Sequence, residues 1–422
     1  MKKIIFILLI LSQIYPYPLY SQSTPEQKLI TVSKKKETVE KLLQWNADVL
    51  MERKGKIYIL ARPKDLNKLQ SNHIPYTMEK LPSSTPLGSM SSQNGINGAY
   101  HSYSELERDL LTLEEKHPQT VKVFNIGDTL EKRNIYALKI SDHVQMDEQE
   151  AEVIFLGCHH AREWISVEVP LLLGKHLAEN YSTDPQIQEI VNQSEIWIVP
   201  LVNPDGLHYS IYFYRYWRKN RRNNEDGTYG VDLNRNYDYK WGFDNKGSSP
   251  QSSSNVYRGN SPFSEPETQS IRDLFSIKNF QALISYHSYS QIILYPWGYT
   301  TQPSPKDEMM ENMAAQMSAL MKPVSGRVYR YGQAGASLYL TNGDTTDWAL
   351  GDHNIPSFTI ELPPVDILHG GFFNSEEDIH HIFRENLPAA LYLIRWAIQE
   401  YSPSSLPPEP SSRNSPLRKE RK

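Results

Sequence analysis

Residues 153–164 read VIFLGCHHAREW, and this stretch decides the fold that the sequence predicts. Residues 153–157 form an unbroken apolar run, which is typical of a strand buried on both faces of a sheet. Side chains that bind metals, His160 and Glu163, follow the run directly. Ligand sites of open α/β sheets lie just beyond the carboxyl ends of the strands. The stretch therefore predicts both a central strand and the place of a site.

Similar apolar runs alternate with amphipathic helices through residues 99–401. Leu106, Leu110 and Leu113, for example, share one face of an expected helix. This alternation predicts an α/β domain with a mixed, mostly parallel central sheet and helices on both faces. The expected strands are 121–126, 135–140, 153–157, 196–201, 282–286 and 357–362.

A smaller unit precedes this domain at residues 22–79. Its order of patterns is strand, helix, strand, strand, helix and strand. Apolar residues mark strands at 29–32, 49–51 and 57–60, and Pro63 opens the second helix. The sequence therefore predicts a compact α+β unit, and its place in the chain suggests a propeptide.

The remaining segments lack the apolar residues that a core requires. In residues 1–21 two lysines precede a short apolar stretch, which is the layout of a secretory signal peptide. The alternative is a permanent N-terminal anchor. Residues 80–98 are rich in Pro, Ser and Gly and predict an exposed, cleavable linker. Residues 402–422 predict a disordered basic tail, with weak anchoring as the alternative. We expect a secreted or periplasmic protein without a stable membrane span.

The composition argues against some other classes of function. The net charge of −5 gives no general attraction to nucleic acid. The one cysteine, Cys158, excludes an internal disulfide. Because it ends an apolar run, we expect a buried strand residue rather than a nucleophile.

Three residues predict a catalytic metal site: His160, Glu163 and His287. Two imidazoles and one carboxylate leave a zinc ion one ligand short of tetrahedral, and this open position separates catalytic from structural sites. A water held there has a pKa of about 7 and becomes a nucleophile. His160 and Glu163 are three residues apart and can share a face, whereas His287 depends on the fold to reach them.

Further motifs stand in a fixed order along the chain. They are GCHHAREWIS at 157–166, NPDG at 203–206, WRK at 217–219, GVDLNRN at 230–236, SYHSYSQ at 285–291, LYP at 294–296, YG at 331–332, DW at 347–348 and SFTIEL at 357–362. Together they resemble the zinc metallocarboxypeptidases of the pancreatic A/B type. The resemblance covers about residues 97–400, and a weaker one to the family's propeptide covers 22–92.

The resemblance implies catalytic roles for the matching residues. It makes His160, Glu163 and His287 the ligands of one Zn2+ ion, with His159 as a neighbour rather than a ligand. Asp232 matches the acid that orients the first histidine. The other two matches are Glu361, the general base that moves a proton from water to the leaving amine, and Arg218, which supports the oxyanion.

The resemblance also implies how a substrate is held. Asn234, Arg235 and Tyr339 match the groups that bind the terminal carboxylate of a peptide. A guanidinium grips a carboxylate with two hydrogen bonds, and an endopeptidase has no need of that clamp. The upstream part of the peptide would contact the remaining matches, which are Arg162, Ser288 and Tyr289.

Specificity depends on the segment between Tyr339 and Trp348. Thr346 stands where A-type enzymes have an aliphatic residue and B-type enzymes an acid, and we expect Asp344, two residues earlier, at the rim of the pocket, where a Lys or Arg could reach it. With Thr341, this arrangement resembles the bacterial carboxypeptidase T branch, whose pocket accepts apolar and basic ends. We therefore expect apolar and aromatic C-terminal residues to be removed well, and Lys and Arg more weakly.

The sequence thus predicts a secreted zinc exopeptidase, made as a zymogen, that hydrolyses the C-terminal peptide bond. We expect its partners to be peptides with a free C-terminus and an activating protease, and we expect a monomer that binds no nucleic acid. Ca2+, which some bacterial relatives use, has no signature that can be read here. The alternatives are an amidase or carboxypeptidase acting on cell-wall peptides, and an inactive binding homologue.

Overall fold

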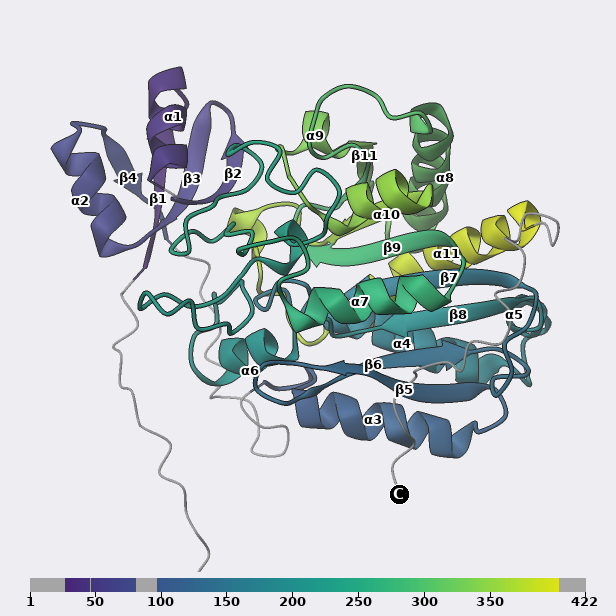
Figure 1. The fold of residues 1–422 in the computed structure, drawn as a ribbon. Helices are drawn as coiled ribbons and strands as arrows, with labels where there is room; N and C mark the ends of the chain where they lie inside the picture. Colours follow the sequence, from purple (N-terminus) through teal and green to yellow (C-terminus); the bar gives the residue numbers. More distant parts are fainter. Residues whose placement is uncertain (1–26, 46, 81–96, 402–422) are drawn as a thin grey trace, which may run out of the picture.

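The structure, a computed structural model, describes residues 27–45, 47–80 and 97–401 (Figure 1). The expected signal peptide at 1–21, most of the expected linker at 80–98, and the expected tail at 402–422 lie outside these residues. Among the described residues, no helix combines the length and the apolar character that crossing a membrane requires.

An eight-stranded mixed sheet forms the centre of the larger domain, in the order β11-β10-β12-β9-β7-β8-β6-β5. The strands are β5 (Val121–Asp128), β6 (Asn134–Ile140), β7 (Ala151–Gly157), β8 (Ser194–Val199), β9 (Phe280–Ser288), β10 (Ile292–Tyr295), β11 (Arg330–Gln333) and β12 (Ser357–Leu362). The four central strands β8, β7, β9 and β12 are parallel, whereas β5, β6 and β10 pair antiparallel with their inner neighbours. The predicted fold class is confirmed.

Helices cover both faces of this sheet (Figure 1). On one face lie α3 (Tyr103–Lys116), α4 (Ile165–Asn180), α5 (Pro185–Val191), α6 (Pro204–Tyr212), α8 (Asp307–Ser325) and α11 (Asp378–Glu400). The other face packs against α7 (Pro266–Ile277) and α10 (Thr345–His353). Along β7, Val153 and Phe155 join the first core while Ile154 and Leu156 join the second. Burial on both faces therefore explains why the run at 153–157 is unbroken.

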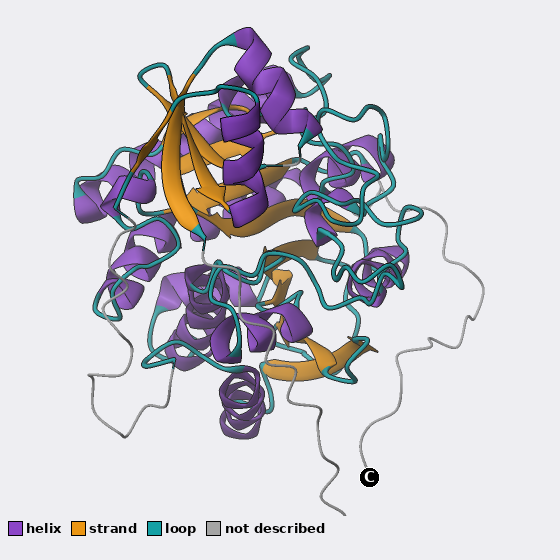
Figure 2. Cartoon of the chain, turned by 90° about the vertical axis from the view of Figure 1, so that its left-hand side faces the viewer, coloured by secondary structure: helices purple, strands orange, loops and turns teal. Residues whose placement is uncertain are grey.

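The smaller unit is a four-stranded antiparallel sheet in the order β2-β3-β1-β4. Its elements are β1 (Lys28–Ser33), α1 (Lys36–Gln44), β2 (Asp48–Arg53), β3 (Lys56–Ala61), α2 (Pro63–Ser71) and β4 (Tyr76–Met78), in the order that the sequence predicts. Figure 2 shows this unit in front, as a lobe set against the larger domain.

Two strands, β10 and β11, are absent from the sequence prediction. Each has only four residues, and β11 reads RYGQ, with no apolar run or alternation that would mark a strand. Its place in the sheet comes from parallel pairing with β10.

Candidate active site

The three predicted metal ligands meet at the carboxyl edge of the sheet. β7 ends at Gly157, and the following loop carries His160 and Glu163. β9 is the parallel neighbour of β7, and His287 is its last residue but one. Parallel neighbours end at the same edge, so pairing brings residues more than 120 positions apart into contact. All three side chains are buried.

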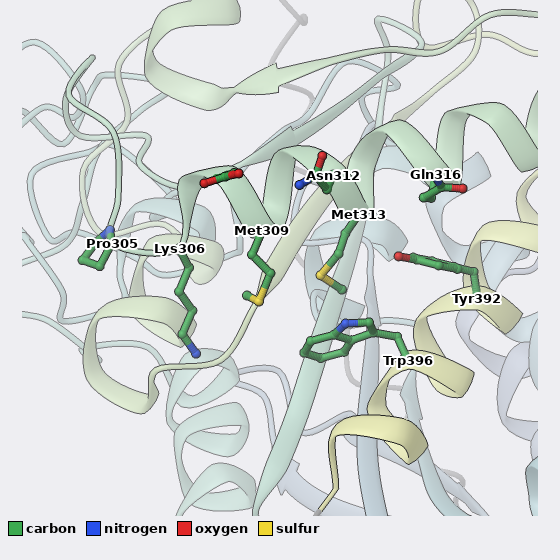
Figure 3. Close-up of a pocket in the computed structure, with 9 residues that line it drawn as sticks. Pro305, Lys306, Met309, Asn312, Met313, Gln316, Tyr392 and Trp396 are labelled. Carbon is green, nitrogen blue, oxygen red and sulfur yellow. The ribbon is translucent and has the colours of Figure 1, made fainter.

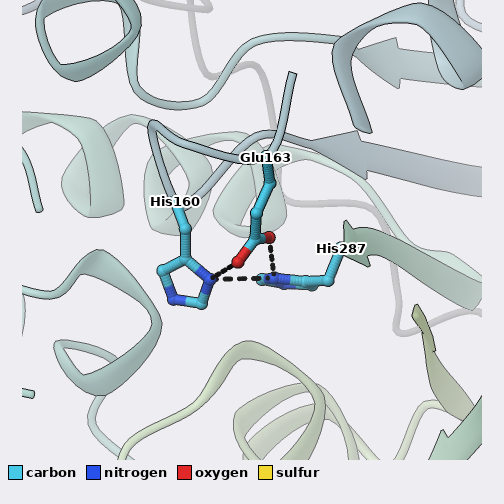
Figure 4. Close-up of side chains that lie close together, drawn as sticks. All are labelled: His160, Glu163 and His287. Atoms are coloured by element: carbon cyan, nitrogen blue, oxygen red, sulfur yellow. Dashed lines mark hydrogen bonds and ion pairs between the residues drawn. The ribbon is translucent and has the colours of Figure 1, made fainter. Parts of the chain in front are cut away.

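Their ligand atoms converge on one point (Figure 4). His160 Nδ1 lies 2.8 Å from Glu163 Oε1, and His287 Nδ1 lies 3.0 Å from Glu163 Oε2. The two Nδ1 atoms are 3.1 Å apart. The structure therefore brings together the set that the sequence predicts.

This donor set fits a zinc ion. His160 Nε2 lies 3.1 Å from Asp232 Oδ1, and His287 Nε2 lies 3.1 Å from Ser285 Oγ. When each Nε2 carries the proton that it donates to its partner, the two Nδ1 lone pairs face each other at van der Waals distance, and a cation relieves their repulsion. Burial lowers the pKa of His287 and so favours the neutral ring that binds metals. Burial alone would raise the pKa of Glu163, but His160 and His287 hold that pKa well below its usual range.

Asp232 joins the first histidine to Arg218. Its Oδ2 accepts hydrogen bonds from Arg218 Nε and Nη2, at 3.1 and 3.0 Å, while Oδ1 faces His160. The pKa of Asp232 lies well below its usual range, because the effect of Arg218 and His160 exceeds that of burial. Arg218 Nη1 remains on the metal side, 3.9 Å from Glu163 Oε1.

Glu361 stands beside the metal ligands because of strand register. β12 pairs in parallel with β9, and this pairing sets Glu361 directly opposite His287. The carboxylate is buried, and its Oε2 has no hydrogen-bond partner in the part of the chain that the structure describes. Burial, together with the charge of Glu163, raises the pKa of Glu361 well above its usual range. A buried carboxyl with one free oxygen is suited to receive a proton.

Asn234 and Arg235 lie on a short 3-10 turn, η2 (Leu233–Arg235). The guanidinium of Arg235 is buried and donates to backbone oxygens, from Nε to Gly247 and from Nη1 to Asn234. Within the described residues it forms no ion pair. Asn234 Oδ1 accepts from both the backbone N and Oγ1 of Thr345, at 2.9 and 2.8 Å. The amide NH2 of Asn234 is therefore the end left for another partner.

The residues predicted to contact the upstream peptide lie against the smaller unit. Arg162 Nη1 donates to Asp48 Oδ2 at 3.0 Å, and the Arg162 guanidinium lies 4.2 Å from the ring centre of Phe372. Tyr289 is buried in one apolar cluster with Leu29 and Tyr58 of the smaller unit.

Two other predicted residues differ in exposure. Ser288 is buried, its backbone N donates to Glu163 Oε2 at 3.2 Å, and its hydroxyl has no partner within the described chain. Tyr339 is 49% exposed and has Arg218 and Arg235 as charged neighbours.

The predicted specificity residues gather at the start of α10. Asp344 is buried and caps the helix by accepting from the backbone N of Asp347 at 2.9 Å. Thr346 Oγ1 donates to Asp344 Oδ1 at 2.9 Å, and Thr341 Oγ1 donates to Asp344 Oδ2. A Cβ built on Gly298 would lie 2.7 Å from Asp344 Oδ2, so the backbone there comes close to the carboxylate. Asp344 is thus more enclosed than a rim position would be.

Sequence reasoning assigned no role to four buried polar residues that lie behind the predicted metal ligands. They are His159, Tyr237, Ser285 and Thr345. Of the four, Ser285 could have been noticed in the sequence, because it places a hydroxyl within an apolar strand. The contacts of the other three depend on tertiary structure.

Other groups in the described chain are poorer candidates for this site. Figure 3 shows a groove between α8 and α11, lined by Met309, Met313, Tyr392 and Trp396, which contains none of the predicted site residues. A second acidic cluster holds Glu152 and Glu195, but Lys278 Nζ lies 2.9 Å from a carboxylate oxygen of each and already supplies the positive charge.

Comparisons with known proteins agree with this geometry. The zinc carboxypeptidase family model matches residues 106–389. The zinc carboxypeptidase of Saccharothrix mutabilis subsp. capreolus is 31% identical over 81% of this chain and 82% of its own length. Carboxypeptidase A1 of Mus musculus is 36% identical over 62% of each chain.

Two solved structures share the fold. The crystal structure of thrombin activatable fibrinolysis inhibitor has a TM-score of 0.76 and 26% identity, covering 89% of this chain and 99% of its own. Carboxypeptidase A from Helicoverpa armigera has a TM-score of 0.76 and 25% identity, covering 89% and 98%. The chain therefore belongs to the zinc carboxypeptidase family, whose cofactor is Zn2+.

Proposed function

We propose that this chain is an exopeptidase that removes the C-terminal residue of peptides and proteins, with His160, Glu163 and His287 as zinc ligands. The observation that carries the proposal is the buried guanidinium of Arg235, which forms no ion pair within the described chain. A buried charge is costly unless it is paired. A substrate carboxylate supplies that charge, and the amide NH2 of Asn234 adds a second donor.

The proposed mechanism assigns one task to each group. Zinc, when bound, polarises the scissile carbonyl and makes water nucleophilic near neutral pH. Glu361 accepts a proton at its free Oε2 and returns it to the leaving amine. Arg218 directs Nη1 to the developing oxyanion, because Asp232 holds its other nitrogens. Tyr339, at the exposed rim, covers the bound residue and excludes water.

The proposed test uses peptides that differ only at the C-terminus. A free acid should lose one residue, and the matching C-terminal amide should resist, because it offers no charge to Arg235. Mass spectrometry identifies the products. Internal cleavage, or equal cleavage of the amide, would refute the proposal.

We further propose broad specificity, as in the bacterial carboxypeptidase T branch. Peptides ending in Phe or Leu should be cleaved well, Lys and Arg detectably, and Glu poorly. Asp344→Asn should keep activity on Leu and lose it on Lys and Arg, because Asn caps a helix as well as Asp does but carries no charge. Asp184→Asn, at the cap of α5, is the matched control. The test compares kcat/KM values for peptides with these different C-terminal residues. Efficient removal of Glu would contradict the proposed specificity.

The smaller unit is proposed to be a propeptide, released by a protease that cuts between residues 80 and 98. Two contacts support this: Asp48 pairs with Arg162, and Leu29 and Tyr58 cover Tyr289. The likeness to the fibrinolysis inhibitor structure also extends over 89% of the chain, more than residues 99–401 could supply.

Asp48→Ala should raise the activity of the uncleaved protein. Truncating one partner of a buried charge pair costs about 2–5 kcal/mol, so we expect an increase of about tenfold or more. Activity after limited proteolysis should match the parent. Glu37→Ala, in the exposed Glu37–Lys41 pair of the same unit, should change neither value. An uncleaved parent as active as the cleaved one would contradict the propeptide role.

We also propose a secreted or periplasmic monomer. The support for export is the pattern of residues 1–21, two lysines followed by a short apolar stretch. N-terminal sequencing of the exported protein would locate the cut.

A further inference from the structure

A row of buried polar side chains runs behind the metal site, from β9 across the loop after β7 to the start of α10. Its members are Ser285, His159, Tyr237 and Thr345, and all are at most 1% exposed. The proposed mechanism uses none of them. Buried polar groups satisfy their hydrogen bonds within the protein, so the direction of each bond can be deduced.

The deduction begins at the metal. His287 offers Nδ1 to the metal, so its proton is on Nε2 and is donated to Ser285 Oγ at 3.1 Å. Ser285 must then direct its own proton elsewhere. His159 Nδ1, at 3.4 Å, is the acceptor on its other side. His159 Nδ1 is therefore without a proton.

The other nitrogen of His159 continues the row. A neutral ring with a bare Nδ1 carries its proton on Nε2, which lies 2.9 Å from Tyr237 Oη and 3.1 Å from Thr345 Oγ1. The hydroxyl of Thr345 donates a hydrogen bond to Asn234 Oδ1 at 2.8 Å. That bond and the one from the Thr345 backbone N at 2.9 Å fix the Asn234 amide with its NH2 group free to donate.

The opposite direction is incompatible with the metal. If His159 carried its proton on Nδ1, it would donate to Ser285, and the Ser285 hydroxyl, whose own proton must also find an acceptor within the row, would donate to His287 Nε2. The His287 proton would have to sit on Nδ1, where it blocks a metal. A single direction of the hydrogen bonds along the row therefore leaves His287 Nδ1 free for the metal and the Asn234 NH2 free for the substrate carboxylate.

We infer that His159 is a positioning residue that supports two parts of the site at once, the metal ligand His287 through Ser285 and the clamp residue Asn234 through Thr345. The inference rests on the proposed zinc site and clamp, and it gives a role to the row of residues that lies outside both. The ring of His159 also stacks on that of His287, with centroids 5.5 Å apart and planes inclined by 13°. It therefore restrains the ligand by contact as well as by hydrogen bonding.

The test uses variants that cut the row at different points. Ser285→Ala removes the hydroxyl that bonds to His287, and Thr345→Val removes the hydroxyl that bonds to Asn234. His159→Leu removes the ring that bonds to both hydroxyls. His159→Gln keeps one donor and one acceptor. Ser194→Ala is the matched control, because within the described residues the buried hydroxyl of Ser194 bonds to Ile190 O alone. Zinc affinity is measured on the full chain by competition with a chromogenic chelator, and kcat and KM after limited proteolysis of the linker.

Loss of such an outer-shell partner weakens metal binding about 10- to 100-fold, so Ser285→Ala should weaken zinc affinity by that factor and leave KM near the parent value. Loss of one neutral hydrogen bond is worth about fivefold, so Thr345→Val should raise KM by about that much at unchanged zinc affinity. His159→Leu should change both, and His159→Gln should restore part of each.

The outcomes separate this inference from the proposed function. A parent that binds no zinc, or does not release C-terminal residues, refutes the proposed function. If the parent does both and Ser285→Ala or a folded His159→Leu keeps parental zinc affinity, the positioning role of His159 is refuted. Should His159→Leu fail to fold, Ser285→Ala and Thr345→Val still decide, because each must change one quantity and spare the other.

Discussion

Removal of zinc by a chelator should abolish peptide hydrolysis, and added Zn2+ should restore it. The Nδ1 atoms of His160 and His287 lie 3.1 Å apart beside the Glu163 carboxylate, and this set would hold the cation that the chelator removes. The site then has no Lewis acid to polarise the carbonyl or activate water. Because zinc binds the folded state, saturating metal at 1,000 times its dissociation constant should also add about 4 kcal/mol of stability.

The measurement follows activity, zinc content and thermal midpoint on the same samples. Mg2+ is the control: it requires octahedral oxygen coordination, so it should restore neither activity nor the midpoint. Full turnover in a sample verified to be free of metal would contradict the zinc mechanism.

Glu361→Gln should lower kcat by about 10²- to 10⁴-fold, the usual contribution of a general base. The amide has nearly the shape of the carboxylate but cannot accept and return the proton. Zinc affinity should persist, because Glu361 lies beside the ligand set without belonging to it. Comparison of kcat with metal content therefore separates loss of the base from loss of the site.

Glu267→Gln is the matched control for that variant. Glu267 is also a buried glutamate, one of whose oxygens has no partner among the described residues, but it lies on α7, outside the set of predicted metal ligands. Burial and nearby Glu265 raise the pKa of Glu267 to about 8, so it is already largely neutral at pH 7. Its replacement by the neutral amide should leave kcat unchanged. Parental kcat in Glu361→Gln would remove Glu361 from the mechanism.

The sequence was most informative where local patterns and long-range structure agree. The strand expected at 357–362 coincides with β12, and the order of elements in the smaller unit was predicted correctly. The run at 153–157 was readable because both faces of β7 are buried. Motif order also singled out the three residues whose ligand atoms meet at the carboxyl edge of the sheet.

The rest depends on tertiary pairing that no local pattern records. β11 has a polar sequence and exists because β10 pairs with it. The pairing of Asp48 with Arg162 requires the smaller unit and the larger domain to meet. Asp344 looked like a rim residue, yet it is buried as the cap of α10. The row through His159 and Ser285 follows from the register of β7 against β9.

The central claim is that a zinc site and a carboxylate clamp act together on the end of a peptide chain. The most direct measurement is the ratio of kcat/KM for a free-acid peptide to that for its C-terminal amide, in the cleaved parent and in Arg235→Gln. The parent should prefer the acid by about 10²-fold or more, the range expected when a buried charge loses its partner. Arg235→Gln should lose most of that preference through the acid, with zinc affinity unchanged. A parent without preference, or an Arg235→Gln variant that keeps all of it, would contradict the account.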